Sequence, residues 1–162
     1  MNTTDSLTTL FSHNLWANLR LLKRCADLNT EQMAASIPGA RGPIHETLEH
    51  IATSEQSYFS RISTGQPYQR PKDALPMSVA DMMDSMRTTG EGLIEWVRNV
   101  QADDAVKLDW DGIPREVPKT IILTQVINHA TEHREQVKGI LTEQGIEPPD
   151  LSGWAYFDEL DR

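Results

Sequence analysis

Two histidines stand four residues apart in the segment His129-Ala130-Thr131-Glu132-His133. On a helix this spacing puts both imidazoles on one face, one turn apart, where they can bind the same metal ion. Both also occupy positions in an apolar series with spacings of three or four residues: Ile122, Val126, His129, His133, Val137 and Ile140. Buried imidazoles are costly unless their nitrogens find partners, which a metal would supply. A carbonyl or hydroxyl group across a helix bundle would also satisfy them, so the pair alone is a weak signal.

A third ligand would have to come from another helix, and the candidates are His13, His45 and His50. On their shared segment, His45 and His50 each lie roughly 120° from the middle of an apolar stripe, on opposite sides of it. His50 is favoured by its sector, which holds small or polar residues that would suit a wet cavity: Thr47, Ser54 and Ser57. The residues by themselves leave the third ligand open.

Glu55 falls almost at the centre of the same apolar stripe, so its carboxylate needs a buried partner. One partner would be an imidazole, which the carboxylate would orient from outside a metal site, and another would be the guanidinium of Arg134. A third interpretation is that the carboxylate merely reaches solvent at the end of the bundle. Together with Glu132, Glu55 is also a candidate for handling protons during catalysis.

Residues 46–51, followed by Glu55, and residues 128–136 resemble the second-helix and fourth-helix motifs of the DinB family. Residues 16–18 resemble the opening helix of that family, and residues 145–150 resemble its turn after the last long helix. The similarity spans nearly the whole chain. One departure is Glu135, where the family often has glycine, and it concerns the packing or charge beside the site rather than the ligands.

The resemblance implies a divalent metal bound by His50, His129 and His133. Zinc or nickel suits all-nitrogen ligation best, and iron, manganese and cobalt are alternatives, because ligand type alone does not select among them. Three neutral imidazoles leave an open coordination position, as in catalytic rather than closed structural sites. Some relatives in this family transfer low-molecular-weight thiols to electrophiles, some isomerise small acids with a thiol cofactor, and many have no assigned activity.

Three hypotheses follow. The first is a metal-dependent enzyme acting on a small-molecule substrate, either a thiol S-transferase that uses a low-molecular-weight thiol or a hydrolase. The second is a non-catalytic, stress-associated metal-binding module. The third is a metal-free scaffold that dimerises through a helix face, since the many apolar positions are compatible with a homodimer. Metal analysis separates the third hypothesis from the others, and a thiol-dependent turnover assay separates the first from the second.

Four long stretches with helical periodicity must position these residues. They cover residues 4–27, 43–64, 78–100 and 118–144, with proline and glycine at the breaks between them.

Shorter signals mark the ends and connections of these stretches. Ser78 suits a helix N-cap, with Asp81 three residues on. Alternating apolar residues and the Asp111-Gly112 turn signal predict a hairpin between residues 104 and 118. The aromatic tail, residues 151–160, is expected to fold back over the bundle. The sequence thus predicts one all-α domain over residues 1–162, a four-helix bundle with a short β-hairpin in the crossover before the last long helix.

Composition excludes several classes of partner. Of the 162 residues, 15 are Lys or Arg and 24 are Asp or Glu, which gives a net charge of -9. Such a surface repels phosphate backbones and anionic lipid, so neither nucleic acid nor a membrane is expected as a partner. Residues 1–10 lack the pattern of a signal peptide, no apolar run approaches the ~20 residues of a membrane span, and Cys25 is the single cysteine. A cytoplasmic location is the expectation.

Overall fold

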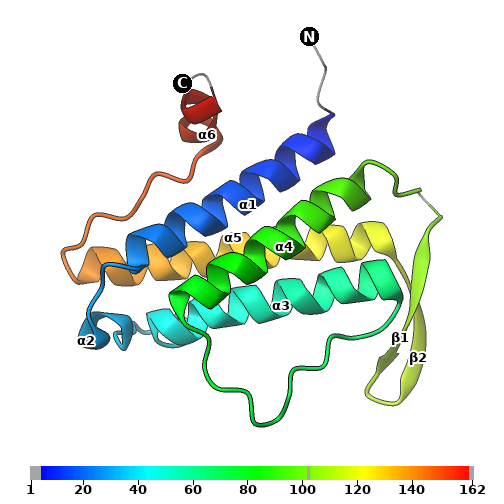
Figure 1. The fold of residues 1–162 in the computed structure, drawn as a ribbon, viewed down its shortest axis with the longest axis horizontal. Helices are drawn as coiled ribbons and strands as arrows, with labels where there is room; N and C mark the ends of the chain where they lie inside the picture. Colours follow the sequence, from blue (N-terminus) through cyan, green and yellow to red (C-terminus); the bar gives the residue numbers. More distant parts are fainter. Residues whose placement is uncertain (1–4, 102, 161–162) are drawn as a thin grey trace.

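The computed structural model describes residues 5–101 and 103–160, apart from the side chain of Trp110. Its elements are α1 (Ser6–Cys25), α2 (Thr30–Met33), α3 (Ile44–Thr64), α4 (Val79–Val97), β1 (Ala105–Trp110), β2 (Ile113–Pro118), α5 (Lys119–Glu143) and α6 (Gly153–Leu160). The four long helices and the hairpin before the last of them confirm the predicted fold class (Figure 1). The predicted start of the first helix, Thr4, and the ends of the predicted domain lie outside the described residues.

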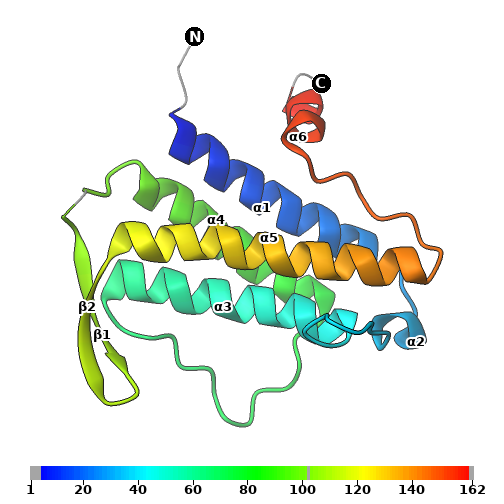
Figure 2. The same ribbon diagram turned by 180° about the vertical axis from the view of Figure 1, so that it is seen from behind.

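The four long helices form a ring in which α1 packs on α4 and α5, and α3 packs on the same two helices. After α3, residues 65–78 return along the bundle, so α4 runs in the same direction as α3 (Figure 1). Seen from behind, α5 lies along α3 and runs opposite to it (Figure 2). The hairpin stands at the end of the bundle where α3 ends and α5 begins. This topology places α3 and α5 side by side, although they are distant in sequence.

Local sequence signals set the boundaries of these elements. The Ser78 hydroxyl accepts a hydrogen bond from the Asp81 amide at 3.1 Å, and the Asp81 carboxylate accepts one from the Ser78 amide at 3.0 Å, so the predicted capping box is present. The hairpin turns at Asp111 and Gly112, whose φ angles of 54° and 80° are both left-handed. A two-residue turn of this kind needs positive φ at both positions, which is why the Asp-Gly pair predicted it.

The core divides into two clusters along the bundle. The cluster remote from the hairpin includes Leu21, Leu22, Ile44, Leu48, Met82, Met86, Ile140 and Leu141. The cluster beside the hairpin includes Phe11, Ile62, Leu93, Val106, Ile122 and Val126. At Gly90 a Cβ atom would lie 2.7 Å from the Leu15 side chain, so α1 and α4 approach closely only because this residue is glycine.

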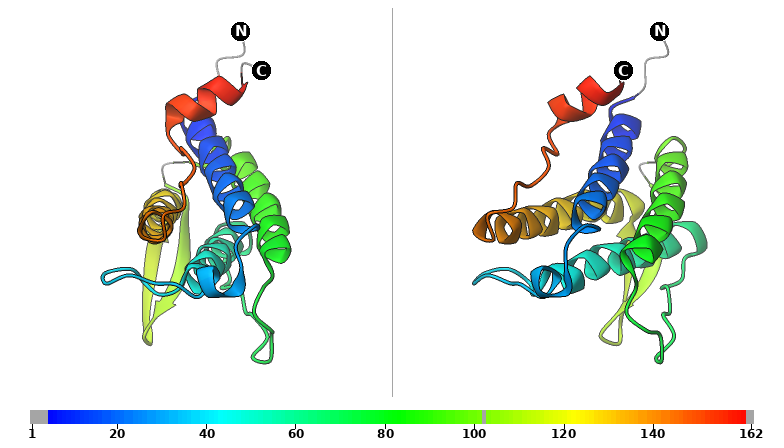
Figure 3. Two further views of the ribbon diagram at one scale, coloured as in Figure 1. Left: turned by 90° about the vertical axis from the view of Figure 1, so that its left-hand side faces the viewer. Right: turned by 60° about the vertical axis from the view of Figure 1, so that its left-hand side comes forward.

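The tail covers the bundle only in part. Helix α6 lies beside α1 at the edge of the molecule (Figure 3), where the Tyr156 ring packs 5.3 Å from the Trp16 ring. Trp154 and Phe157 are 82% and 55% exposed. The prediction that the aromatic tail packs over the bundle is therefore wrong for these two residues. Leu7 in the first turn of α1 is exposed as well. Within the described ranges, no helix is long and apolar enough to span a membrane.

Candidate metal centre

The structure brings His50, His129 and His133 together between α3 and α5. The ring centroids of the three imidazoles lie 4.5 to 4.9 Å apart, and their candidate ligand nitrogens all lie within 4.8 Å of one another. The closest approach is 2.9 Å, between the Nε2 atoms of His50 and His129. The antiparallel packing of α3 and α5 supplies this proximity across 79 residues of sequence.

The three imidazoles fit a divalent ion. Two nitrogens that each lie about 2.1 Å from one ion are roughly 3.0 Å apart at a right angle and roughly 3.4 Å apart at a tetrahedral angle. The His50 and His129 Nε2 atoms, 2.9 Å apart, need to separate only slightly to share an ion. The Nδ1 atom of His133 lies 2.8 Å from Oε1 of Gln136. Since that amide oxygen only accepts, Nδ1 carries the proton and Nε2 keeps its lone pair. His133 is buried, whereas the other two rings are half-buried and leave one side of the cluster approachable.

The surroundings hold the His50 and His129 imidazoles in the neutral form that a metal requires. Burial lowers the pKa of His50 to about 4, with further contributions from the charges of Arg41 and His133. Burial also lowers the pKa of His129 to about 4, helped by the two other histidines and by Arg41. Protons therefore compete weakly for these two rings at neutral pH.

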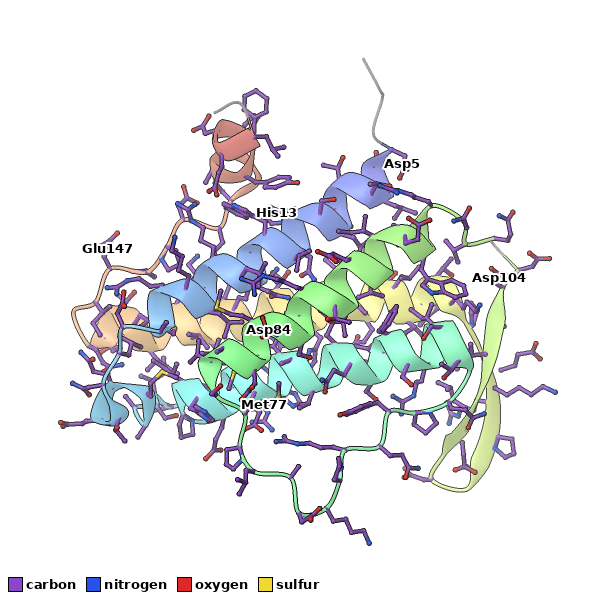
Figure 4. The ribbon with its side chains drawn as sticks, viewed as in Figure 1. Asp5, His13, Met77, Asp84, Asp104 and Glu147 are labelled. Carbon is purple, nitrogen blue, oxygen red and sulfur yellow. The ribbon has the colours of Figure 1, made fainter. Side chains whose placement is uncertain are left out.

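The other two candidates for the third ligand lie elsewhere. His13 is on α1 beside α6 (Figure 4), and its Nε2 lies 2.8 Å from the Leu151 carbonyl oxygen. The Nε2 atom of His45 lies 2.9 Å from the carbonyl oxygen of Met77, just before α4 (Figure 4). Backbone carbonyls satisfy both rings. Of the three candidates for a third ligand, His50 is therefore the one that lies with His129 and His133.

Glu55 belongs to a second polar cluster, here called the Glu55 network: Asn14, Asn18, Glu55, Thr89 and Arg134. The Glu55 carboxylate is 3% exposed and accepts hydrogen bonds from Thr89 at 2.6 Å and from the two asparagine amides at 3.2 and 3.3 Å. Arg134 donates to both asparagine oxygens at 2.7 Å. The interpretation that Glu55 reaches solvent is therefore wrong. The direct pair with Arg134 is not present among the described residues, because the two asparagines lie between the carboxylate and the guanidinium.

The two predicted proton-handling carboxylates lie in different surroundings. Burial raises the pKa of Glu55 to about 7, against the opposing effects of the Thr89 hydrogen bond and the Arg134 charge. Glu132 is exposed on α5, and among the described residues its carboxylate makes no hydrogen bond or ion pair. Neither carboxylate is hydrogen-bonded to an imidazole of the cluster in the described part of the chain.

A cleft of about 700 Å³ opens one helical turn from His50 and His129. Its walls come from α3, the hairpin and α5: Ser54, Ser57, Tyr58, Arg61, Leu108, Asp109, Asp111, Val117, Ile121, Ile122 and Gln125. The Tyr58 ring stands edge-on to His129 at 5.8 Å and so joins the cleft to the cluster. Of the three small polar residues predicted to line a cavity beside His50, Ser54 and Ser57 do line this cleft. Thr47 does not, because it is buried and its hydroxyl donates to the Gly42 carbonyl.

Sequence reasoning did not single out Gln136, Tyr58 or Arg61 as site residues. A signal existed for Gln136, because it follows His133 by three residues and shares its helix face. The same holds for Tyr58, which lies two turns after His50. Arg61 gives no such signal, because only the position of the hairpin makes it part of a cleft.

Comparison with known proteins agrees with the fold described above. A model described as the DinB family matches residues 1–159. A solved structure of a DinB-like protein from Bacillus cereus ATCC 10987 aligns with a TM-score of 0.62 and 20% identity, covering 86% of this chain and 91% of that one. A DinB-like protein from Bacillus subtilis aligns with a TM-score of 0.64 and 15% identity, covering 91% and 99%. At these identities the structures support the fold alone. No curated protein matches the chain.

Proposed function

Because this chain belongs to the DinB family, we propose that it binds one divalent metal ion through His50, His129 and His133 and acts enzymatically on a small molecule in the adjoining cleft. The observation that carries the proposal is the convergence of three imidazoles from two helices, with ligand nitrogens within 4.8 Å of one another. All-nitrogen ligation favours zinc or nickel, with iron, manganese and cobalt as alternatives.

The proposed reaction is thiol S-transfer or hydrolysis. A divalent ion held by three neutral ligands would act as a Lewis acid and would favour the deprotonated form of a water molecule or a low-molecular-weight thiol. The chain's own contribution begins with Gln136, which fixes the ring orientation of His133. Tyr58 can donate a hydrogen bond to a substrate in the cleft. Leu108 and Ile122 line the same cleft and would exclude water from the apolar part of the substrate.

The two carboxylates take different parts in this proposal. Glu132 is free to exchange protons with solvent on the exposed side of α5. Glu55 is buried, and its hydrogen bonds run through Asn14 and Asn18 toward Arg134, the residue after His133. We therefore propose Glu55 as a positioning residue that holds α5 in register, although its pKa of about 7 also suits proton transfer.

Elemental analysis of protein purified without chelator or affinity tag tests the metal site. We expect about one ion per chain, lost in His129→Ala and kept in His13→Ala, because His13 is satisfied by the Leu151 carbonyl. If the wild-type chain neither contains nor takes up a divalent ion, the proposed function is rejected.

Turnover assays test the reaction. Thiol-dependent consumption of an electrophile would identify a transferase, and thiol-independent cleavage would identify a hydrolase. Bound metal without turnover over a broad panel would favour the non-catalytic, stress-associated module. Sedimentation analysis tests the homodimer, which together with the cytoplasmic location stays a prediction from the sequence.

A further inference from the structure

Arg61 is a half-buried cation in the cleft beside the three histidines. Its Nη1 donates to the Ser57 carbonyl oxygen at 3.3 Å and also contacts the Ser57 hydroxyl. Both partners are neutral and belong to its own helix. Four other arginines of the described chain pair with carboxylates: Arg20, Arg70, Arg87 and Arg98. Within the described ranges no carboxylate lies within 4 Å of the Arg61 guanidinium, so its charge is available to a ligand.

Two aspartates line the same cleft, on the hairpin wall opposite α3. Both Asp109 and Asp111 are exposed, and one oxygen of Asp109 accepts a hydrogen bond from the Gly112 amide at 2.7 Å. Water screens exposed charges strongly, whereas the half-buried guanidinium acts in a lower dielectric. The α3 wall of the cleft therefore favours an anion despite the two acids across from it.

The remaining walls are largely apolar. Leu108 and Val117 come from the hairpin, and Ile121 and Ile122 come from the first turn of α5. A ligand that fills the cleft would bury carbon atoms against these side chains while it placed its anionic end at Arg61. A planar guanidinium pairs best with a carboxylate or phosphate, and apolar walls favour the less strongly hydrated carboxylate.

The position of Arg61 also sets the length of the ligand. Its guanidinium reaches back to Ser57, which lies seven residues after His50 on α3. At a rise of about 1.5 Å per residue, this corresponds to roughly 10 Å along the helix. A molecule of about that length would extend from Arg61 past Tyr58 to the three histidines.

We infer that Arg61 binds the carboxylate of an amphipathic organic acid whose other end reaches the three-histidine cluster. This inference deepens the proposed function and rests on it for the reactive end of the molecule. It adds the substrate class, an organic acid with an apolar body, and makes Arg61 the residue that determines specificity.

The test compares 4-phenylbutyrate with its neutral amide, 4-phenylbutyramide. The full-length protein is kept in EDTA, so that the carboxylate has no metal to bind, and both probes are titrated by amide chemical-shift changes. We expect the acid to bind about tenfold more tightly than the amide, because a charge-assisted pair with arginine is lost in the amide. Shifts should centre on Ser57, Arg61 and the hairpin. Arg61→Gln should abolish the preference and leave the affinity for the amide unchanged.

Arg98→Gln is the matched control, because Arg98 is exposed directly after α4 and pairs with Glu95 at 3.0 Å. This variant should keep the tenfold preference. Arg61→Lys should keep part of it, since the charge remains and the planar fork is lost. Three outcomes would overturn the inference: equal binding of acid and amide, no binding of either probe, or loss of the preference in Arg41→Gln instead of Arg61→Gln.

Zinc uptake by the same samples separates the two proposals. Normal zinc stoichiometry without a carboxylate preference rejects the role of Arg61 and leaves the metal site standing. A carboxylate preference without zinc uptake rejects the proposed function and leaves the anion site in the cleft.

Discussion

The three-histidine cluster and the Glu55 network are two polar groupings in one bundle, and their bonding differs. In the Glu55 network, the carboxylate, the two asparagines and Arg134 bond to one another across α1, α3 and α5, and Thr89 adds α4. In the histidine cluster, one ring nitrogen bonds to Gln136, while the Nε2 atoms of His50 and His129 face each other at 2.9 Å. The network is saturated by the chain itself. In the cluster, no hydrogen bond of the described residues reaches Nε2 of His133, so that nitrogen keeps a lone pair for a metal ion.

This difference separates two roles for buried polar atoms. Within the described residues, no buried side-chain nitrogen or oxygen lacks a partner, so the network does not depend on a ligand. A saturated network fixes the relative positions of the four helices that it joins, and substitution of one member leaves polar atoms of its neighbours unpaired. The cluster should tolerate substitution far better in the fold but should respond strongly to a metal.

Glu55→Ala should produce the largest effect on stability. The change removes the acceptor of three hydrogen bonds. It leaves one amide donor each of Asn14 and Asn18 unpaired, and it leaves the Arg134 charge without its nearest buried counter-charge. We expect the free energy of unfolding to fall by about 3–5 kcal/mol. Urea denaturation in EDTA measures it.

His129→Ala provides the contrast in the same experiment. Its half-buried imidazole contributes less to the metal-free fold, so its loss should lower the free energy of unfolding by about 1 kcal/mol. Equal destabilisation by the two substitutions would contradict the division between a saturated network and an unsaturated cluster.

Metal removal should produce the next largest effect. An ion that binds the folded chain and not the unfolded chain stabilises the protein by about 3 kcal/mol when its concentration is 100 times Kd. Chelator should therefore lower Tm in the wild type and in His13→Ala, and should leave Tm unchanged in His129→Ala. Thermal unfolding with zinc and with EDTA measures this, and an identical chelator response in the two variants would refute the assignment of His129.

The histidine cluster and the Glu55 network could be predicted from the sequence only where the interacting residues belong to the same helix. The spacing of His129 and His133 placed two imidazoles on one face, since both belong to one helix. His50 could not be chosen from periodicity, because its two partners belong to another helix at least 79 residues away, and family resemblance was needed. The position of Glu55 within the apolar stripe of its helix predicted that its side chain is buried. Nothing in the sequence identified Asn14 and Asn18 as its hydrogen-bond partners. Their role depends on how α1 is rotated against α3 and α5.

The pH dependence of stability should show a smaller effect from Glu55. Burial raises the pKa of Glu55 to about 7 from its ordinary 4.5, with Arg134 as the charged group facing it. The folded chain thus keeps this proton where the unfolded chain has lost it. The contribution of Glu55 is fully present below about 4.5 and is lost as the pH rises to about 7. We expect a decline of roughly 1–3 kcal/mol across this window.

Glu55→Gln should remove that decline, because the amide is neutral throughout. It can retain the network if its oxygen accepts from the asparagines while its amide donates to Thr89, whose hydroxyl has a second acceptor in the Ser85 carbonyl at 3.1 Å. Urea denaturation of both proteins in EDTA at several pH values measures the difference. Parallel curves for the wild type and the variant would show that Glu55 titrates alike in the folded and unfolded chains.

A small effect, on metal affinity rather than on stability, is expected for Gln136, the hydrogen-bond partner that α5 supplies to His133 of the cluster. Its side-chain oxygen accepts from His133 Nδ1 at 2.8 Å and from the Arg41 amide at 3.2 Å, so it fixes both the tautomer and the rotation of the ring. Gln136→Ala should weaken zinc binding about tenfold, equivalent to ~1.4 kcal/mol, while Tm in EDTA changes little. Competition titration with a chromophoric chelator measures Kd.

Gln56→Ala is the matched control, because the Gln56 side chain donates a hydrogen bond to Ser85 at 2.7 Å and belongs neither to the histidine cluster nor to the Glu55 network. If both variants bind zinc as the wild type does, the orientation of His133 is set by helix packing alone, and the cluster is less dependent on outer partners than its hydrogen bonds indicate.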